Sequence, residues 1–135
     1  MDADNEKIFS FFRFEDLRIY HKSIEYIIWV HKKGIAIQKQ DHGLLSTRFC
    51  HAAQNICSSI AEGSARNKSQ FIYYLKMAKS SIRDCVVYTT IAAELGYLTR
   101  EEQEFSRNYL MEMTKMLGAL IGSLQKSAGG SDSDD

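Results

Sequence analysis

The chain contains no proline among its 135 residues, so it lacks the residue that most strongly interrupts α-helices. It also lacks a charge-poor apolar run near the ~20 residues that cross a bilayer. The start, MDADNEKIFSFFRF, is acidic where a secretory signal would be basic. With 44% hydrophobic residues and few turn clusters, the sequence predicts a cytoplasmic, all-α protein with no membrane association and one core.

Cysteine is scarce, and its pattern argues against the common cysteine-based sites. Cys50, Cys57 and Cys85 are odd in number, include no C-x-x-C pair and fall within helical apolar patterns. This arrangement favours buried free thiols over a disulfide framework or a zinc site, and it fits a reducing compartment.

Motifs for other cofactors are missing as well. No acid is followed by histidine at the Glu-x-x-His spacing of di-iron bundles, and no phosphate-binding or nucleophile-elbow glycine motif occurs. Glu62 and Asp84 would form an acid pair if their helices brought them together, but Glu62 is also spaced to pair with Arg66. We therefore expect no metal, no cofactor and no enzymatic activity, with structural roles for both acids.

Apolar residues recur at three- and four-residue steps in four segments, which predicts helices over 15–33, 44–62, 68–95 and 99–125. Gly34, Gly63 and Gly96 stand where left-handed helix stops are common. Asn67 with Gln70, and Thr99 with Glu102, have the spacing of capping boxes at the third and fourth starts. Short connections between amphipathic helices are typical of an antiparallel up-and-down four-helix bundle.

The predicted core face of the first helix contains Leu17, Tyr20, Ile24, Ile27, Ile28 and His31, and that of the fourth includes Phe105. The first and third helices each carry a second apolar line. One interpretation is that subunits bury these lines against one another; the other is that a small bundle tolerates exposed tyrosines. The candidate oligomer-interface residues are Ile19, Tyr26, Trp29, Val30, Tyr74, Met77, Tyr88 and Ile91.

The formal net charge of zero conceals a segregation of charge along the chain. Residues 17–83 carry eleven bases and three acids, whereas the segments on either side are acidic. Basic residues recur along one side of the third helix and along part of the first, which suits binding to phosphates. Rows of lysine are also commonly just a solvated face, and both interpretations stay open. The candidate nucleic-acid-binding residues are Arg18, Lys22, Arg66, Lys68, Lys76, Lys79 and Arg83.

Four stretches resemble a known family: FEDLRIYHKS at 14–23, NICSSIAEGSAR at 55–66, FIYYLKMAKSSIRD at 71–84 and ELGYL at 94–98. Their order and spacing resemble the four-helix proteins encoded in intervening sequences of bacterial 23S rRNA genes, also labelled S23 ribosomal proteins. The family's Asn-Ile-Ala-Glu-Gly run is matched from Ser59 to Gly63, with serine in place of asparagine. Its Gly-Ser-Leu-x-Glu run is altered to the residues 80–84, ending at Asp84. Glu62, Gly63 and Asp84 are therefore the structural-motif candidates.

The resemblance implies a homopentameric ring and relatives that include the accessory protein of diversity-generating retroelements, thought to bind nucleic acid and a reverse transcriptase. The expected organisation is an N-terminal arm over 1–13, the bundle over 14–125 and a disordered acidic tail over 126–135. The predicted function is a non-enzymatic oligomeric bundle that binds RNA or a nucleic-acid-processing protein through basic faces of the first and third helices. The alternative is a protein interaction scaffold without direct nucleic-acid binding.

Overall fold

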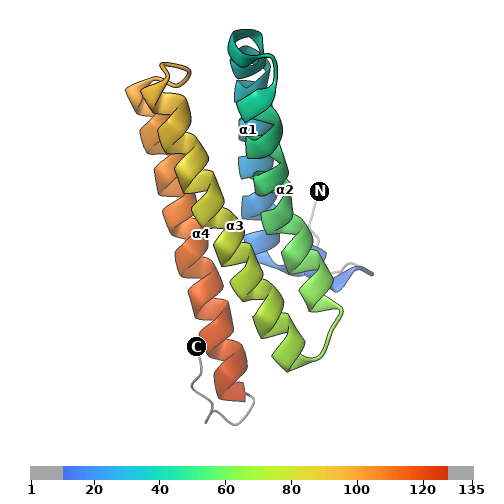
Figure 1. Ribbon diagram of the computed structural model, residues 1–135. Coiled ribbons are helices and arrows are strands. Elements are labelled where there is room, and N and C mark those ends of the chain that lie inside the picture. The colour runs from blue at the N-terminus through green and yellow to red at the C-terminus, as the bar shows by residue number, and fades with distance from the viewer. Residues whose placement is uncertain (1–10, 128–135) are drawn as a thin grey trace, which may run out of the picture.

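The computed structural model describes residues 11–127, which form one short 3₁₀ helix and four α-helices (Figure 1). Successive α-helices run antiparallel, so the α1–α2 and α3–α4 turns lie at one end and the α2–α3 turn at the other. The predicted all-α up-and-down bundle is confirmed. Parts of the predicted arm and tail, residues 1–10 and 128–135, lie outside the described residues. The elements are η1 (Arg13–Asp16), α1 (Arg18–Asp41), α2 (Leu44–Ser64), α3 (Lys68–Glu94) and α4 (Arg100–Ser127).

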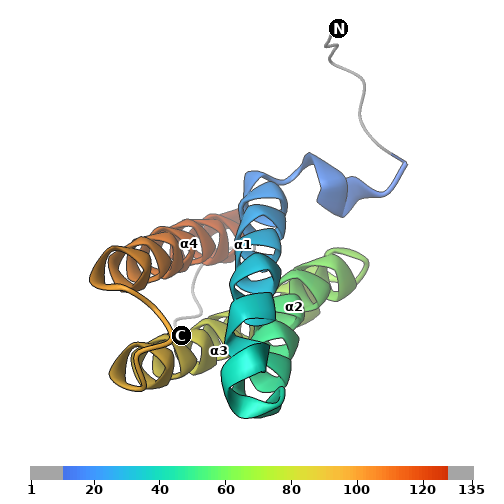
Figure 2. The same cartoon turned by 90° about the horizontal axis from the view of Figure 1, so that it is seen from above.

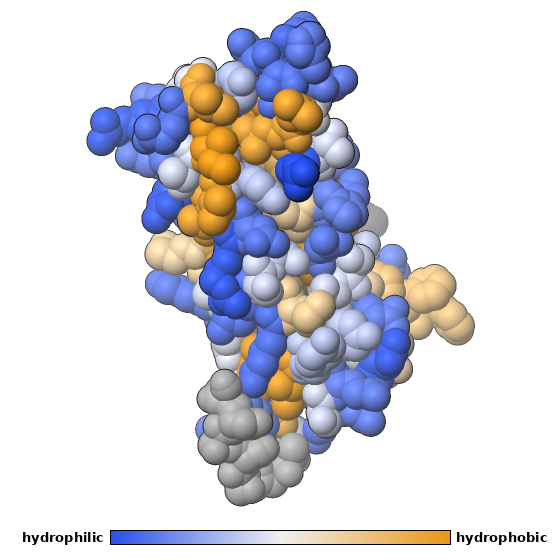
Figure 3. All heavy atoms as spheres, viewed as in Figure 1, coloured by the Kyte–Doolittle hydropathy of each residue, from blue (hydrophilic) through white to orange (hydrophobic). Residues whose placement is uncertain are grey.

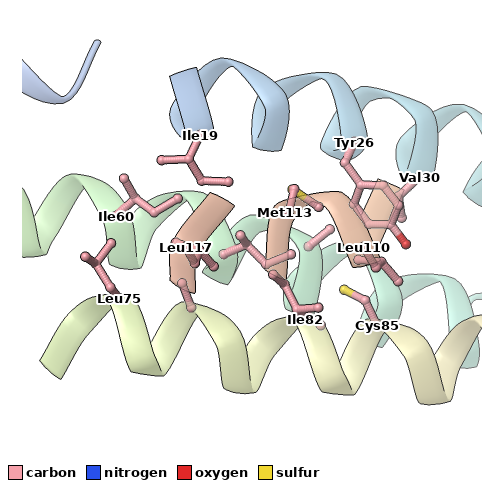
Figure 4. Close-up of a cluster of buried hydrophobic side chains, with 14 of the residues drawn as sticks. Ile19, Tyr26, Val30, Ile60, Leu75, Ile82, Cys85, Leu110, Met113 and Leu117 are labelled. Carbon is pink, nitrogen blue, oxygen red and sulfur yellow. The ribbon is translucent and has the colours of Figure 1, made fainter. Parts of the chain in front are cut away.

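Aliphatic side chains from all four helices meet along the bundle axis (Figure 4). Each helix contributes residues at three- and four-residue steps, and burial of each such side chain is worth about 1.5–3 kcal/mol. A second, smaller cluster at the end with the α1–α2 turn joins Ile37, Leu45, Ala92 and Leu98. Cys57 and Cys85 are buried free thiols, as predicted, and Cys50 is a half-buried free thiol.

The core face of α1 is not the one that the sequence pattern favoured. Ile19, Tyr26 and Val30 are almost wholly buried within their own chain, at 3%, 0% and 1% exposure, so their prediction as oligomer-interface residues is wrong. The predicted core residues Ile28 and His31 are exposed instead. Apolar residues occupy so much of the circumference of α1 that periodicity alone does not select the inner face.

Polar partners inside the bundle explain why Tyr26 faces inward. Its hydroxyl lies 2.7 Å from Ser106 Oγ, which in turn lies 2.8 Å from Thr89 Oγ1. Thr89 also donates to the backbone carbonyl of Cys85 at 2.8 Å. Burial raises the pKa of Tyr26 well above its usual range, so the phenol stays protonated. This hydroxyl network links α1, α3 and α4 in the middle of the apolar core.

Gly34 does not end α1, which continues for seven further residues to Asp41. The glycine is buried, and a Cβ there would lie in ordinary contact with Cys50 Sγ, at 3.5 Å. The extra turns bring Ile37 into the smaller core cluster, which offsets the ~1 kcal/mol helical cost of glycine. The helix stops instead at His42, whose φ of 57° is left-handed, and the Asp41 carboxylate accepts hydrogen bonds from the amides of Gly43 and Leu45.

Gly63 is a packing residue and not the predicted helix cap, because α2 runs on to Ser64. A Cβ added to Gly63 would lie 2.6 Å from Tyr74 Cβ and 3.0 Å from Phe71, so only glycine lets α2 and α3 approach this closely. The predicted caps at the starts of α3 and α4 are confirmed, whereas α1 starts at Arg18 and not at Glu15, because η1 occupies residues 13–16. Asn67 Oδ1 accepts from the Gln70 amide, and Thr99 and Glu102 form a reciprocal capping box at 2.9 and 3.0 Å.

The α1–α4 pair packs less extensively than the sequential helix pairs, and it combines aromatic contacts with polar ones. Lys33 Nζ lies 2.7 Å from Glu102 Oε2, and Tyr109 donates to Glu25 at 2.6 Å. Figure 2 shows η1 beside the start of α1, and η1 also contacts α2. None of the described helices is long and apolar enough to cross a membrane.

Candidate nucleic-acid interface

A basic groove of about 380 Å³ lies between α3 and α4. Three cations of α3 line one side, and none of the described residues that line the groove is acidic. The opposite side belongs to α4, where Gly118 and Gly122 replace side chains with open space: a Cβ added at either would meet nothing within 4 Å. The lining residues are Lys76, Lys79, Arg83, Gly118, Ile121, Gly122 and Gln125.

Helical spacing explains why the three cations gather there. Lys76, Lys79 and Arg83 are three and four residues apart, so they follow one side of α3 over about 10 Å. On α4, Lys115 and Lys126 are eleven residues apart, which is close to three full turns, and they share a face with the two glycines. The glycines and these two lysines were missed from the sequence. The sequence pattern that could have identified them is a Gly-x-x-x-Gly spacing with a lysine on either side. Its position opposite Lys79 follows only from the packing of α4 against α3.

The other predicted cations are held elsewhere by local partners. Arg66 donates from Nε at 3.0 Å and from Nη2 to the same carboxylate oxygen of Glu62, and its guanidinium lies over the Tyr74 ring at 5.3 Å. The hydrogen bond to Glu62 raises the pKa of Arg66. Glu62 therefore has the structural partner expected of it.

Lys22 lies between α1 and α4, 2.7 Å from Glu112 and over the Tyr109 ring at 4.2 Å. The hydrogen bond to Glu112 raises the pKa of Lys22 and offsets its charge locally. Arg18 is exposed at the start of α1, beside a small apolar pocket. These two cations do not join the α3–α4 groove.

Lys68 lies at the end of α3 nearest the α4 terminus, where its Nζ donates to the Ser127 carbonyl at 3.3 Å. It therefore continues the basic line of α3 toward the point where α4 ends. Asp84 is exposed on α3, ten residues and about 15 Å beyond Tyr74, which packs on Gly63. Glu62 and Asp84 are thus not an acid pair. Within residues 11–127, no three His, Cys, Asp or Glu side chains are grouped to hold a metal ion.

Beside the basic side of α3 runs an exposed apolar stripe. Of the remaining predicted interface residues, Met77 and Ile91 are 43% and 40% exposed, and both lie on this stripe. Val87 and Tyr73 share the same face and were missed, whereas Leu95 belongs to the second apolar line predicted on the third helix. Figure 3 shows an orange stripe over the part of α3 near its C-terminal end, with blue side chains below it.

Trp29, Tyr74 and Tyr88 are half-buried against their own chain. Trp29 packs on Phe105 with ring centroids 5.1 Å apart, and Tyr88 packs on Phe49 at 6.0 Å. Phe105 is 41% exposed, so it covers the edge of the core and does not fill it as predicted. These rings therefore leave less surface for a second subunit than the stripe on α3 does.

The fold defines a four-helix-bundle protein with a basic groove on one side. A model of the family described as "23S rRNA-intervening sequence protein" matches residues 15–119. The chain therefore belongs to this family, as its resemblance suggested.

A crystal structure from Bacteroides thetaiotaomicron, described as a protein of unknown function from the S23 ribosomal protein family, has a similar fold. Its TM-score is 0.72 at 21% sequence identity, over 76% of this chain and 97% of that one. At this identity the likeness supports the fold alone. Comparison with curated proteins finds no match.

Proposed function

We propose that the protein is a non-enzymatic module that binds the phosphate backbone of RNA in the α3–α4 groove. The observation that carries the proposal is the grouping of Lys76, Lys79 and Arg83 opposite the open space at Gly118 and Gly122, with no acid among the described residues that line the groove. Phosphate oxygens are the groups that such cations bind best, and a floor without side chains admits a bulky backbone.

The groove chemistry favours phosphate contacts over reading of bases. The residues that line it include no aromatic ring on which a base would stack. A single copy with about three phosphate contacts would bind weakly, with a salt slope near −2 to −3 on a double-logarithmic plot. We therefore expect little sequence preference and a steep loss of affinity as salt rises.

Self-association would make such weak binding effective. The α3 stripe of Tyr73, Met77, Val87, Ile91 and Leu95 offers one apolar face, and exposed Ile28 and Ile35 on α1 offer another. Two unlike faces on separate helices suit head-to-tail association, which closes into a ring such as the pentamer implied by the family resemblance. Each added copy would contribute another groove, so binding by a ring would gain from multivalency.

The RNA-binding proposal is tested by fluorescence anisotropy with a labelled RNA hairpin at about 50 and 200 mM salt. The variant carries Lys76→Glu, Lys79→Glu and Arg83→Glu. The matched control carries Lys32→Glu, Lys39→Glu and Arg48→Glu, which reverse two lysines and one arginine that are exposed on α1 and α2. We expect binding to be lost in the first and retained in the second. Equal affinity in both, or no binding by the wild type at low salt, contradicts the proposal.

The second candidate function is a scaffold that binds another protein and no nucleic acid. The exposed α3 stripe favours it, because an uncovered apolar face is typical of a protein interaction surface. Replacing Ile91 by aspartate tests both assembly and partner binding by light scattering and by pull-down. A defined partner retained after nuclease treatment, together with absent RNA binding, would favour the scaffold.

A further inference from the structure

The segment that follows α4 matches the groove in charge. Residues 128–135 read AGGSDSDD and carry three aspartates with no base, whereas the groove is lined by Lys76, Lys79 and Arg83 with no acid among its described lining residues. We propose that Asp132, Asp134 and Asp135 bind these cations, so that the groove is the docking site of the chain's own acidic segment.

The point where α4 ends favours this occupant. Lys68 Nζ donates a hydrogen bond to the Ser127 carbonyl at 3.3 Å. This bond links the last residue of α4 to the first turn of α3. The groove begins only a short way back along the same two helices, at Gln125 and Lys76. The last described residue of α4 therefore lies toward one end of the groove.

The segment is long enough to reach the cations. From Ser127 back to Gly118 is nine residues of helix, or about 13.5 Å, whereas the eight residues after Ser127 can span up to about 27 Å. Gly129 and Gly130 supply the backbone freedom needed to reverse direction directly after the helix. The five residues after them would then run antiparallel to α4 along the groove.

The groove also suits the size of the side chains. The segment after the two glycines contains only serine and aspartate, and the open space over Gly118 and Gly122 admits a second backbone with short side chains. Carboxylates close to lysine and arginine form charge-assisted hydrogen bonds, and tethering gives them a local concentration near the millimolar range.

If the groove also binds RNA, as proposed above, the acidic segment competes for the same cations. Its removal then raises RNA affinity, by about three- to tenfold for a weak tethered competitor. The same competition would prevent binding of polyanions that contact a single groove weakly. Polyanions that contact several grooves at once would still bind. This consequence rests on the proposed function, but the docking itself does not.

Nuclear magnetic resonance on the 135-residue chain tests the docking through the backbone amide signals of Gly118 and Gly122. The variant carries Asp132→Asn, Asp134→Asn and Asp135→Asn. Its matched control carries Asp2→Asn, Asp4→Asn and Glu6→Gln, which remove three charges at the other end of the chain. We expect both glycine signals to shift in the variant and to stay in place in the control. The difference should collapse near 1 M salt, where screening is strong. Unchanged glycine signals in the variant overturn the proposal.

RNA titration of the same proteins separates the two proposals. Shifted glycine signals without RNA binding by any protein support the docking and contradict the proposed function. RNA binding that is equal in wild type and variant, with unchanged glycine signals, supports the function and overturns the docking.

Discussion

The hydroxyl groups of Tyr26 and Ser106 lie 2.7 Å apart in the core, although the two residues are 80 positions apart in the chain. This hydrogen bond joins α1 to α4, and Thr89 extends it to α3. A buried polar pair of this kind adds to stability only when both partners are present, because an orphaned hydroxyl in an apolar core is costly.

Replacing Tyr26 by phenylalanine is therefore expected to lower the free energy of unfolding by about 1–2 kcal/mol. The ring stays in place, but Ser106 loses one partner. Chemical denaturation monitored by circular dichroism measures the change. Tyr73→Phe is the control, because that ring is 57% exposed and its change should fall within about 0.5 kcal/mol. Equal stability of the two variants would contradict a role for the network.

Gly63→Ala and Gly118→Ala should change stability in opposite directions. A Cβ at Gly63 would lie 2.6 Å from Tyr74 Cβ, so α2 and α3 must separate, at a cost of about 1–3 kcal/mol. A Cβ at Gly118 meets nothing within 4 Å, so the helical preference for alanine should stabilise the protein by up to about 1 kcal/mol. Thermal unfolding of the two variants side by side measures both effects. A destabilised Gly118→Ala protein would show that this position is not open.

Glu102→Gln should weaken the protein near neutral pH more than in acid. The hydrogen bond from Lys33 and then that from the Thr99 amide hold the pKa of Glu102 below its usual value. A pKa that is lower in the folded state gives stability that is present above the unfolded pKa and lost as pH falls through the folded one. The expected loss at pH 7 is about 0.5–1 kcal/mol, shrinking by pH 3. Denaturant titrations at both pH values measure it, with exposed Glu101→Gln as the control. A loss that is equal at both pH values would contradict the ionic origin.

The three thiols should react with a thiol reagent in an order set by burial. Burial raises the pKa of Cys85 to about 12 and also raises those of Cys50 and Cys57, so little thiolate forms near pH 8. Cys50, the half-buried thiol, should be modified first, and Cys85 only after unfolding. Mass spectrometry of partly labelled protein measures the order. Early labelling of Cys85 would show that the core opens more readily than its packing indicates.

How far the sequence predicts the fold depends on how clearly each helix separates its faces. The inner face of α2 can be read from its sequence because, apart from Leu44 at its start, its large apolar residues, such as Phe49, Ile56 and Ile60, fall on one side. On α1 the apolar residues extend around most of the helix. Whether the face with Tyr26 or the face with Tyr20 lies in the core therefore depends on partners in α3 and α4. The capping boxes were predictable because they involve residues only three positions apart.

The candidate site was predictable only on its α3 side. Lys76, Lys79 and Arg83 show their common face through spacing within one helix. The groove, however, also needs Gly118 and Gly122 opposite them, and nothing local in the sequence pairs residues about 40 positions apart. Likewise, Gly63 has the sequence context of a helix cap, and only the approach of Tyr74 shows that it is a packing residue.

The α1–α4 contact is less extensive than those of the sequential helix pairs, and this has a consequence for how the bundle opens. Its ion pair between Lys33 and Glu102 and its hydrogen bond from Tyr109 to Glu25 weaken with added ions or acid, whereas its aromatic contacts do not. The first large fluctuation of the native protein should therefore be a parting of the first and last helices. Because α4 packs more extensively on α3 than on α1, the groove between α3 and α4 should persist while the first and last helices separate.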